Sequence, residues 1–249
     1  MRAKTFPVTK INKLRKQAER ARRLPPQEEI PEGWRISAVD PMKLLAEFKS
    51  LGIRKGYTLR AYQRCDGGNG SGIVWALPQK AVFPEPEKEP DLKTKFRHLR
   101  MGIGSIRPPR PPEGLDDFME AIHGDGSLWS YLQASLFSRE ALEFGAMWHG
   151  ASWETSLILD SNPFKRSSKG GRGISILNVE KGWKWLEPEP EKWEPAVCME
   201  EDIITVTFFT YSGLGQETIY RHADRYRQGS YQYETEEKII AVGEGRVVF

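Results

Sequence analysis

Residues 128–148 constrain the fold most, because apolar side chains lie on several sides of the helix that this stretch predicts. The bulky positions do not fall on a single stripe: Leu128, Trp129, Leu132, Leu136, Phe137, Leu142, Phe144 and Met147. A helix that is apolar on more than one face has to be covered by the rest of the chain. Ser127 supplies an N-cap at its start. We therefore expect a buried central helix.

Helical and strand patterns occur in blocks around this helix. Asp40 as N-cap, Pro41 at the first helical position and Gly52 after the end predict a helix over residues 40–52. Apolar residues at helical spacing predict two more, at residues 9–24 and 115–124. Strand patterns occur at residues 34–39, 57–64, 73–77, 174–179, 203–211, 217–221 and 239–249. The order predicts an α+β fold with a mixed or antiparallel sheet, a buried central helix and a basic N-terminal helical arm.

Proline-rich stretches suggest where the chain divides. Pro25-Pro26 ends the first helix, so we expect a basic helical arm over residues 1–26 and a single α+β domain over residues 27–249. An acidic Pro-rich connector gives a candidate sub-boundary near residues 84–112. A glycine loop, a strand and the motif Pro-Glu-Pro-Glu-Lys occur in that order twice, ending at residues 88 and 192. Coincidence of biased composition is favoured over a duplicated unit, and both remain open.

Positive charge is concentrated in three segments of the chain. Residues 1–24 carry nine Lys or Arg and one acid, residues 92–112 carry six and no acid, and residues 163–173 carry four and no acid. More than half of the 37 basic residues therefore lie in these segments, although the formal net charge is only +3. Segregated charge of this kind creates local fields that attract anions.

Several classes of protein are not supported by the sequence. The two cysteines form no framework of disulfides and no CxxC motif, so we expect no metal and no cofactor, and a reducing, cytoplasmic location. The basic N-terminus leads into a charged helix and not into an apolar run, which argues against a signal peptide. No apolar run approaches the length of about 20 residues that a membrane-spanning helix needs. We therefore expect no membrane partner.

The basic segments are candidates for binding a polyanion such as nucleic acid, because Lys and Arg release counterions from phosphates. The candidate polyanion-binding residues are Lys13, Arg15, Lys16, Arg20, Arg97, Arg100, Arg107, Lys165, Arg166, Lys169 and Arg172. The alternative is that these segments dock on an acidic protein surface, either of this chain or of a partner subunit. The chain would then be an oligomer or a subunit of a complex.

Aromatic and cationic residues alternate over residues 220–233. Exposed tyrosine rings can stack on bases while arginine contacts phosphate, which makes Tyr220, Tyr226 and Tyr231 stacking candidates. The favoured alternative is an amphipathic strand and loop in which these tyrosines are half buried.

Histidines provide the remaining candidate sites. His149 lies between Trp148 and Trp153, in a composition that suits either a pocket or a core corner with a satisfied histidine, and the second is favoured. His222 and Asp224 are two residues apart, as in pairs where a carboxylate orients an imidazole. No motif names a reaction, so catalytic residues stay unknown apart from the weak candidate His149.

These observations predict a non-enzymatic binding protein that engages a polyanion or a larger assembly through its segregated basic segments. The alternatives are an enzyme of unknown reaction with a pocket near His149 and a structural subunit of a protein complex.

Overall fold

The structure of the chain is a computed structural model that describes residues 2–22, 33–66, 69–86, 108–146, 152–163 and 182–247. The chain divides into two compact units. The first comprises Met1–Lys13, Thr155–Gln228 and Tyr233–Phe249, and the second comprises Leu14–Glu154 and Gly229–Gln232. Helices and antiparallel sheets occur together, so the predicted α+β class is confirmed. The predicted border at residue 26 stays a prediction.

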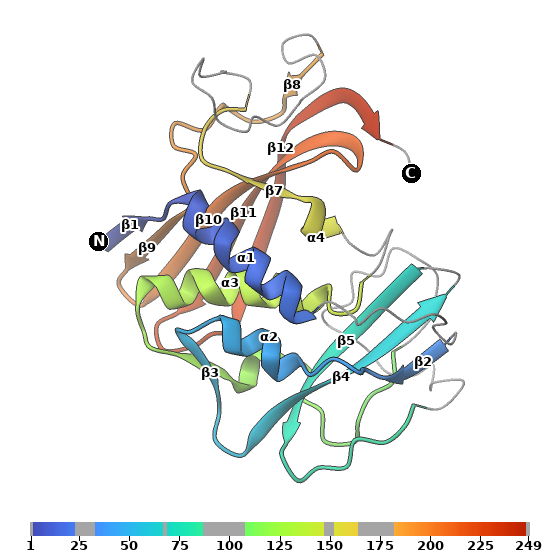
Figure 1. The fold of residues 1–249 in the computed structure, drawn as a ribbon. Helices are drawn as coiled ribbons and strands as arrows, with labels where there is room; N and C mark the ends of the chain where they lie inside the picture. Colours follow the sequence, from blue (N-terminus) through green and yellow to red (C-terminus); the bar gives the residue numbers. More distant parts are fainter. Residues whose placement is uncertain are drawn as a thin grey trace. The chain divides into compact units, whose positions relative to one another are not determined.

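A seven-stranded antiparallel sheet dominates the first unit (Figure 1). Its strands are β1 (Arg2–Thr5), β7 (Leu157–Leu159), β8 (Lys184–Trp185), β9 (Ala196–Glu200), β10 (Ile203–Ser212), β11 (Gly215–Arg227) and β12 (Tyr233–Val247). The order is β1-β9-β10-β11-β12-β8, and β7 also pairs with β10. The long strands β10, β11 and β12 curl visibly in Figure 1. Each of the three overlaps a strand predicted from the sequence, although residues 248–249 of the last prediction lie outside the described residues. The predicted strand at 174–179 lies outside them altogether.

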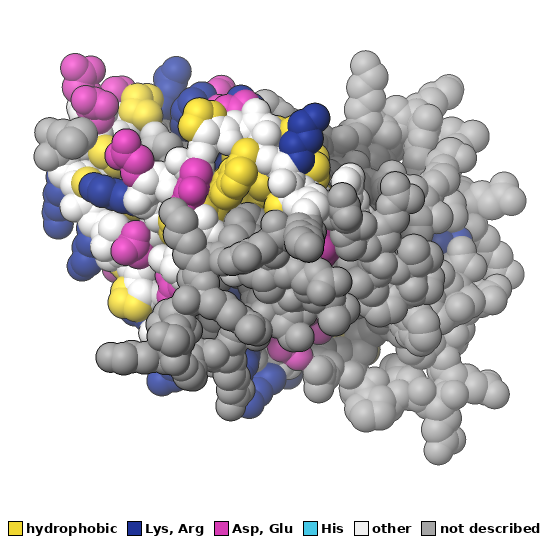
Figure 2. Space-filling view, turned by 90° about the horizontal axis from the view of Figure 1, so that it is seen from above, with side chains coloured by type: hydrophobic (Ala, Val, Ile, Leu, Met, Phe, Trp, Pro, Cys, Tyr) yellow, Lys and Arg dark blue, Asp and Glu magenta, His cyan; other side chains and the backbone are white. Residues whose placement is uncertain are grey.

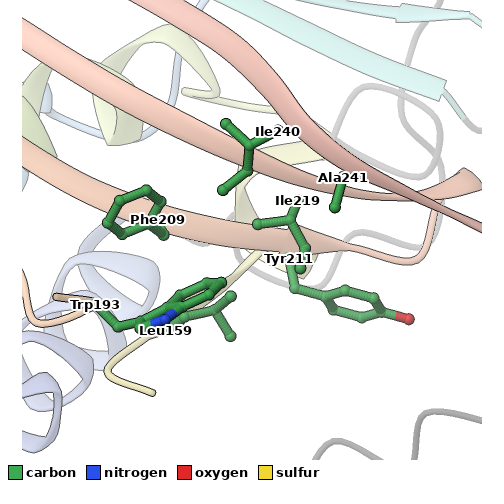
Figure 3. Close-up of a cluster of buried hydrophobic side chains, with 7 residues drawn as sticks. All are labelled: Leu159, Trp193, Phe209, Tyr211, Ile219, Ile240 and Ala241. Atoms are coloured by element: carbon green, nitrogen blue, oxygen red, sulfur yellow. The ribbon is translucent and has the colours of Figure 1, made fainter. Parts of the chain in front are cut away.

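One face of this sheet carries an aromatic core (Figure 3). Its buried members are Leu159, Trp193, Phe209, Tyr211, Ile219, Ile240 and Ala241. The rings of Trp193 and Phe209 lie 5.1 Å apart between centroids. On the other face of β10, the side chains of Ile204, Val206 and Phe208 are buried too. Strand β10 is therefore buried on both faces from Phe208 to Ser212, whereas its first half, from Ile203 to Thr207, is buried on one face only.

Two smaller sheets and most of the helical residues form the second unit. The sheet β2-β4-β5 contains β2 (Gly33–Ile36), β4 (Tyr57–Asp66) and β5 (Asn69–Pro78), and β3 (Leu51–Ile53) pairs with β6 (Ile122–Gly124). The helices along the chain are α1 (Val8–Arg22), which begins in the first unit, α2 (Pro41–Glu47), the 3-10 helix η1 (Phe118–Ala121), α3 (Leu128–Leu142) and α4 (Ser152–Thr155).

Helices α2 and α3 begin where the sequence predicts. The carboxylate of Asp40 accepts a hydrogen bond from the backbone N–H of Met42, and the hydroxyl of Ser127 accepts one from the N–H of Ser130. These bonds satisfy donors that a helix start leaves open. Most residues of α3 are buried, and Phe137 is 0% exposed. Its ring meets the rings of Phe48 and Phe118 edge-on at 5.4 and 5.9 Å.

Three local predictions are wrong. The helix predicted over 40–52 ends at Glu47, and Gly52 lies in β3 and not after the helix end. Residues 115–124 do not form one helix, because the chain makes only η1 and then extends into β6, where Ile122 pairs with Ile53. Residues 65–72, between the predicted strands at 57–64 and 73–77, are mostly strand and not loop, since β4 and β5 pair from Tyr57↔Pro78 to Asp66↔Asn69. A side chain at Gly72 would collide with the carbonyl oxygen of Phe144. Glycine is therefore needed here for close approach of two backbones and not for a turn.

The N-terminal segment is packed, which differs from the expected mobile or partner-docked helix. Strand β1 pairs with β9 along Arg2–Thr5, and the N–H of Phe6 donates to the carbonyl of Pro195 at 2.8 Å. On α1, the apolar stripe of Ile11, Leu14 and Ala18 is buried. This stripe is therefore not open to another chain.

We expect Phe137→Ala to lower the free energy of unfolding by about 3–5 kcal/mol, because the ring is fully enclosed and its loss leaves a cavity. Chemical denaturation measures this change. The control is Leu142→Ala on the same helix, where the side chain is 39% exposed and the expected loss is below about 1 kcal/mol. A Phe137→Ala loss as small as that of the control would contradict the assignment of α3 to the core.

Candidate functional site

Helix α1 separates its cations into an outer and an inner set. The outer set is exposed and consists of Lys10, Lys13, Lys16 and Arg20. Spacings of three, three and four residues keep these four side chains on one side of the helix, opposite the buried apolar stripe. The only acid of α1, Glu19, is half-buried. We call this surface the basic face of α1.

The inner set, Arg15 and Arg22, binds the chain's own acids. The Nε of Arg22 lies 2.9 Å from a carboxylate oxygen of Glu140, and its Nη2 lies 3.0 Å from one of Glu154. The Nε of Arg15 lies 3.5 Å from Glu140. Arg22 and Glu140 are only 5% and 2% exposed. Arg15, which the sequence suggested as a polyanion contact, therefore pairs with an acid of the protein itself. This placement agrees with the alternative in which basic residues dock on acidic groups of the same chain.

Aromatic and backbone groups complete this buried network. The guanidinium of Arg15 lies 4.3 Å from the ring of Trp153, and the indole N–H of Trp153 donates to Glu140 at 2.8 Å. The carboxylate of Glu143 accepts hydrogen bonds from the backbone N–H groups of Trp153 and Glu154. Every charged member of the network thus has a polar partner, which buried charges require.

Burial shifts the pKa values of Glu143 and Arg15 in the directions that favour their neutral forms. Desolvation raises the pKa of Glu143, and the backbone hydrogen bonds from Trp153 and Glu154 oppose that shift. Desolvation lowers the pKa of Arg15, and the charge of Glu140 opposes it. In both groups, burial favours the neutral form and the polar neighbours favour the charged form. Sequence reasoning missed Arg22, Glu140 and Glu143.

A signal for this network was present in the sequence. Glu140 and Glu143 fall at the C-terminal end of a helix whose other residues are mostly apolar or small and uncharged, apart from Arg139. Acids are disfavoured there by the helix dipole, and acids on a buried helix need a cation. Two such residues in one turn therefore indicate a buried basic partner.

Two of the three predicted stacking tyrosines are buried, and the third is half-buried. Tyr226 is 1% and Tyr231 is 4% exposed. The ring of Tyr231 stacks on Tyr131 at 4.7 Å, and its hydroxyl accepts a hydrogen bond from the N–H of Gly126. Their rings therefore serve internal packing, which corrects the prediction for Tyr226 and Tyr231. Tyr220 is half-buried and remains a candidate.

His222 has a different partner from the one its sequence neighbourhood suggests. Its Nε2 lies 2.8 Å from the hydroxyl of Thr210, and its Nδ1 lies 3.2 Å from a carboxylate oxygen of Glu237. Asp224 instead accepts a hydrogen bond from Thr235. The carboxylate, the imidazole and the hydroxyl thus lie in a row across three strands. Thr210 is only 1% exposed, so its hydroxyl cannot meet a substrate, and we assign this arrangement to the core.

Several predicted residues lie outside the described part of the chain, and their arrangement is not known: Arg97, Arg100, Arg107, His149, Lys165, Arg166, Lys169 and Arg172. The pocket expected near His149 is therefore untested. Within the described residues, no group of three or more His, Cys, Asp or Glu side chains could hold a metal ion. On the face shown in Figure 2, described basic side chains lie among acidic and apolar ones.

Comparisons with models of protein families, with curated proteins and with solved structures found no match in any of the three. No helix among the described residues is long and apolar enough to cross a membrane. The function therefore has to be argued from the surfaces of this chain.

The buried network predicts unequal effects of two arginines that are two positions apart on α1. We expect Arg22→Ala to lower the free energy of unfolding by about 3–5 kcal/mol, because it leaves Glu140 buried without that partner. The matched control is Arg20→Ala, whose exposed side chain should change stability by less than about 0.5 kcal/mol. Thermal or chemical unfolding of both variants measures this, and equal losses would refute the inward role of Arg22.

Proposed function

We propose that this protein is a cytoplasmic, non-enzymatic binding protein that engages a polyanion, with nucleic acid as the ligand, through the basic face of α1. The supporting observation is the division of cations on one helix. Arg15 and Arg22 satisfy internal acids, whereas Lys13, Lys16 and Arg20 are exposed without any role in the buried network. The proposal includes α3 as the central buried helix and α1 as the basic helix of the fold.

The dimensions of the basic face suit a phosphate backbone. From Lys10 to Arg20 the helix rises by about 15 Å, since each residue adds about 1.5 Å. Duplex DNA carries one negative charge per about 1.7 Å of its axis, so this length faces several phosphates. Flexible lysines can follow such a backbone without reading its sequence. We therefore expect binding with little sequence preference.

The structure gives less support to the alternative of a complex subunit held by α1. That alternative needs the stripe of Ile11 and Leu14 to pack on another chain, and both side chains are buried within this one.

The two remaining basic segments stay part of the polyanion proposal: Arg97, Arg100, Arg107, Lys165, Arg166, Lys169 and Arg172.

A charge-matched pair of triple variants tests the proposal. The test variant is Lys13→Gln, Lys16→Gln and Arg20→Gln, and the control is Lys43→Gln, Lys49→Gln and Lys55→Gln, which removes three exposed cations from other elements. Affinity for a fluorescent DNA duplex is measured across a salt series. We expect the slope of log affinity against log salt to shrink by up to about 2.7 in the test variant, since each phosphate contact contributes about 0.9.

The control variant should keep nearly the full slope of log affinity against log salt, because the three lysines that it lacks lie outside the basic face of α1. Equal changes in both variants would show that only net charge matters and would remove α1 as the site. Absence of binding by the unaltered protein at low salt would remove the polyanion proposal itself, because electrostatic attraction is strongest there.

A further inference from the structure

One face of the sheet β2-β4-β5 carries aromatic and cationic side chains next to each other. Residues directly opposite in an antiparallel pair lie on the same face. Three such pairs define it: Trp34↔Arg64, Ile36↔Tyr62 and Arg60↔Trp75. The other face of β4 is different in character, since Leu59, Ala61, Gln63 and Cys65 are all buried there.

The aromatic side chains of this face are layered. Tyr62, Trp75 and Leu77 form a buried base, against which the partly buried Trp34, Ile36, Ile73, Ala81 and Phe83 pack. Phe83 stacks on Tyr62 with ring centroids 4.2 Å apart and an angle of 16°. The guanidinium of Arg110 lies 5.6 Å from the ring of Trp75. The chain's own side chains therefore already make ring-on-ring and cation-on-ring contacts here.

Two aromatic donors anchor the flanks of the second basic segment to this face. The hydroxyl of Tyr62 donates to the carbonyl of Pro84 at 2.8 Å, and the indole N–H of Trp75 donates to the carbonyl of Pro109 at 3.1 Å. Burial, with a further contribution from Glu85, raises the pKa of Tyr62 to about 12, so its hydroxyl keeps its proton. The carbonyls of Pro84 and Pro109, which lie on either side of the basic residues 93–107 in the sequence, are thus both held at this face.

A third aromatic donor has no acceptor among the described residues. The indole Nε1 of Trp34 is buried and makes no hydrogen bond, whereas the equivalent atom of Trp75 is bonded. A buried N–H group without a partner is costly. An acceptor supplied by a ligand would remove that cost once neighbouring side chains move to expose this nitrogen.

We propose that this surface binds single-stranded nucleic acid. The aromatic–arginine face consists of Trp34, Arg60, Tyr62, Arg64, Ile73 and Phe83. Bases stack on the partly exposed rings of Trp34 and Phe83, and phosphates bind Arg60 and Arg64. Only unpaired bases offer their faces to such rings, which selects single strands over duplexes. This inference rests on the proposed polyanion-binding function and adds to it a second surface and a class of substrate.

Binding of a proline-rich peptide is the competing explanation of the same aromatic face. Tyr62 and Trp75 already hold proline carbonyls of this chain, and such donors also serve proline-rich ligands in other proteins. Arg60 and Arg64 favour the nucleic acid, since a polyproline backbone has no charge for them to neutralise.

Fluorescence anisotropy with labelled twelve-nucleotide oligouridylate and oligodeoxythymidylate tests the inference, with a duplex of the same length as reference. Arg60→Gln with Arg64→Gln should reduce the salt slope for the single strands by about 1.4, because each contact to a single strand contributes about 0.7. The charge-matched control, Lys43→Gln with Lys49→Gln, should leave the slope unchanged.

Trp34→Leu should weaken single-strand binding about tenfold and leave duplex binding unchanged. Its control, Trp185→Leu, should leave the affinity for both single strands and duplexes unchanged.

A second measurement does not depend on the folding of any variant. Oligouridylate containing 5-iodouracil is crosslinked to the unaltered protein by light, and the crosslinked peptides are identified by mass spectrometry. We expect crosslinks to peptides that contain Trp34 or Phe83.

The outcomes separate this inference from the function on which it rests. Binding of single strands and duplexes alike, unchanged by Trp34→Leu and by the arginine variant, would overturn the inference and leave the proposed function in place. No binding of any nucleic acid at low salt would overturn both. Binding of an uncharged proline-rich peptide at this face, together with nucleotide crosslinks only in peptides from elsewhere in the chain, would assign the face to peptides and overturn the inference.

Discussion

The buried contact between Arg22 and Glu140 determines which side of α1 faces outward. A guanidinium and a carboxylate that are both nearly inaccessible to water have to meet, because either one alone would carry the full cost of desolvation. Once Arg22 points inward, the helical period turns Arg15 inward as well and leaves Lys13, Lys16 and Arg20 on the opposite side. The candidate binding surface is therefore a consequence of an internal ion pair. The exposed and the buried cations on this helix differ in their rotational position.

The parts of the fold that sequence reasoning predicted are those with strong local signals. Asp40 and Pro41 mark the start of α2 without reference to the rest of the molecule, and the many-sided apolar pattern of α3 implies burial by itself. The segment at 115–124 shows the limit of local patterns. Its apolar spacing fits a helix, but pairing of Ile122 with Ile53 in another part of the chain gives a strand instead. Pairing between distant strands leaves no trace in a short window of sequence.

The sequence predicts which segments carry candidate sites, but it does not predict which of their individual residues are exposed. Charge segregation identified α1, yet the division between Arg15 and Lys16 depends on where Glu140 lies in space. The prediction that the tyrosines of residues 220–233 are exposed failed for a related reason. The ring of Tyr231 packs against Tyr131, which belongs to a helix about 100 residues earlier in the chain. The aromatic–arginine face was missed entirely. Strand register brings together its members from β2, β4 and β5, and Phe83 joins them from the segment after β5 by stacking on Tyr62.

The two proline carbonyls held by Tyr62 and Trp75 give these rings a second role besides packing. Each ring is buried and uses its single polar donor on a backbone carbonyl of the chain. A buried ring whose donor is already bonded offers an incoming molecule neither its face nor a hydrogen bond. Any contact of this sheet face with a ligand therefore falls to the partly buried side chains that pack on the base, Trp34 and Phe83 among them.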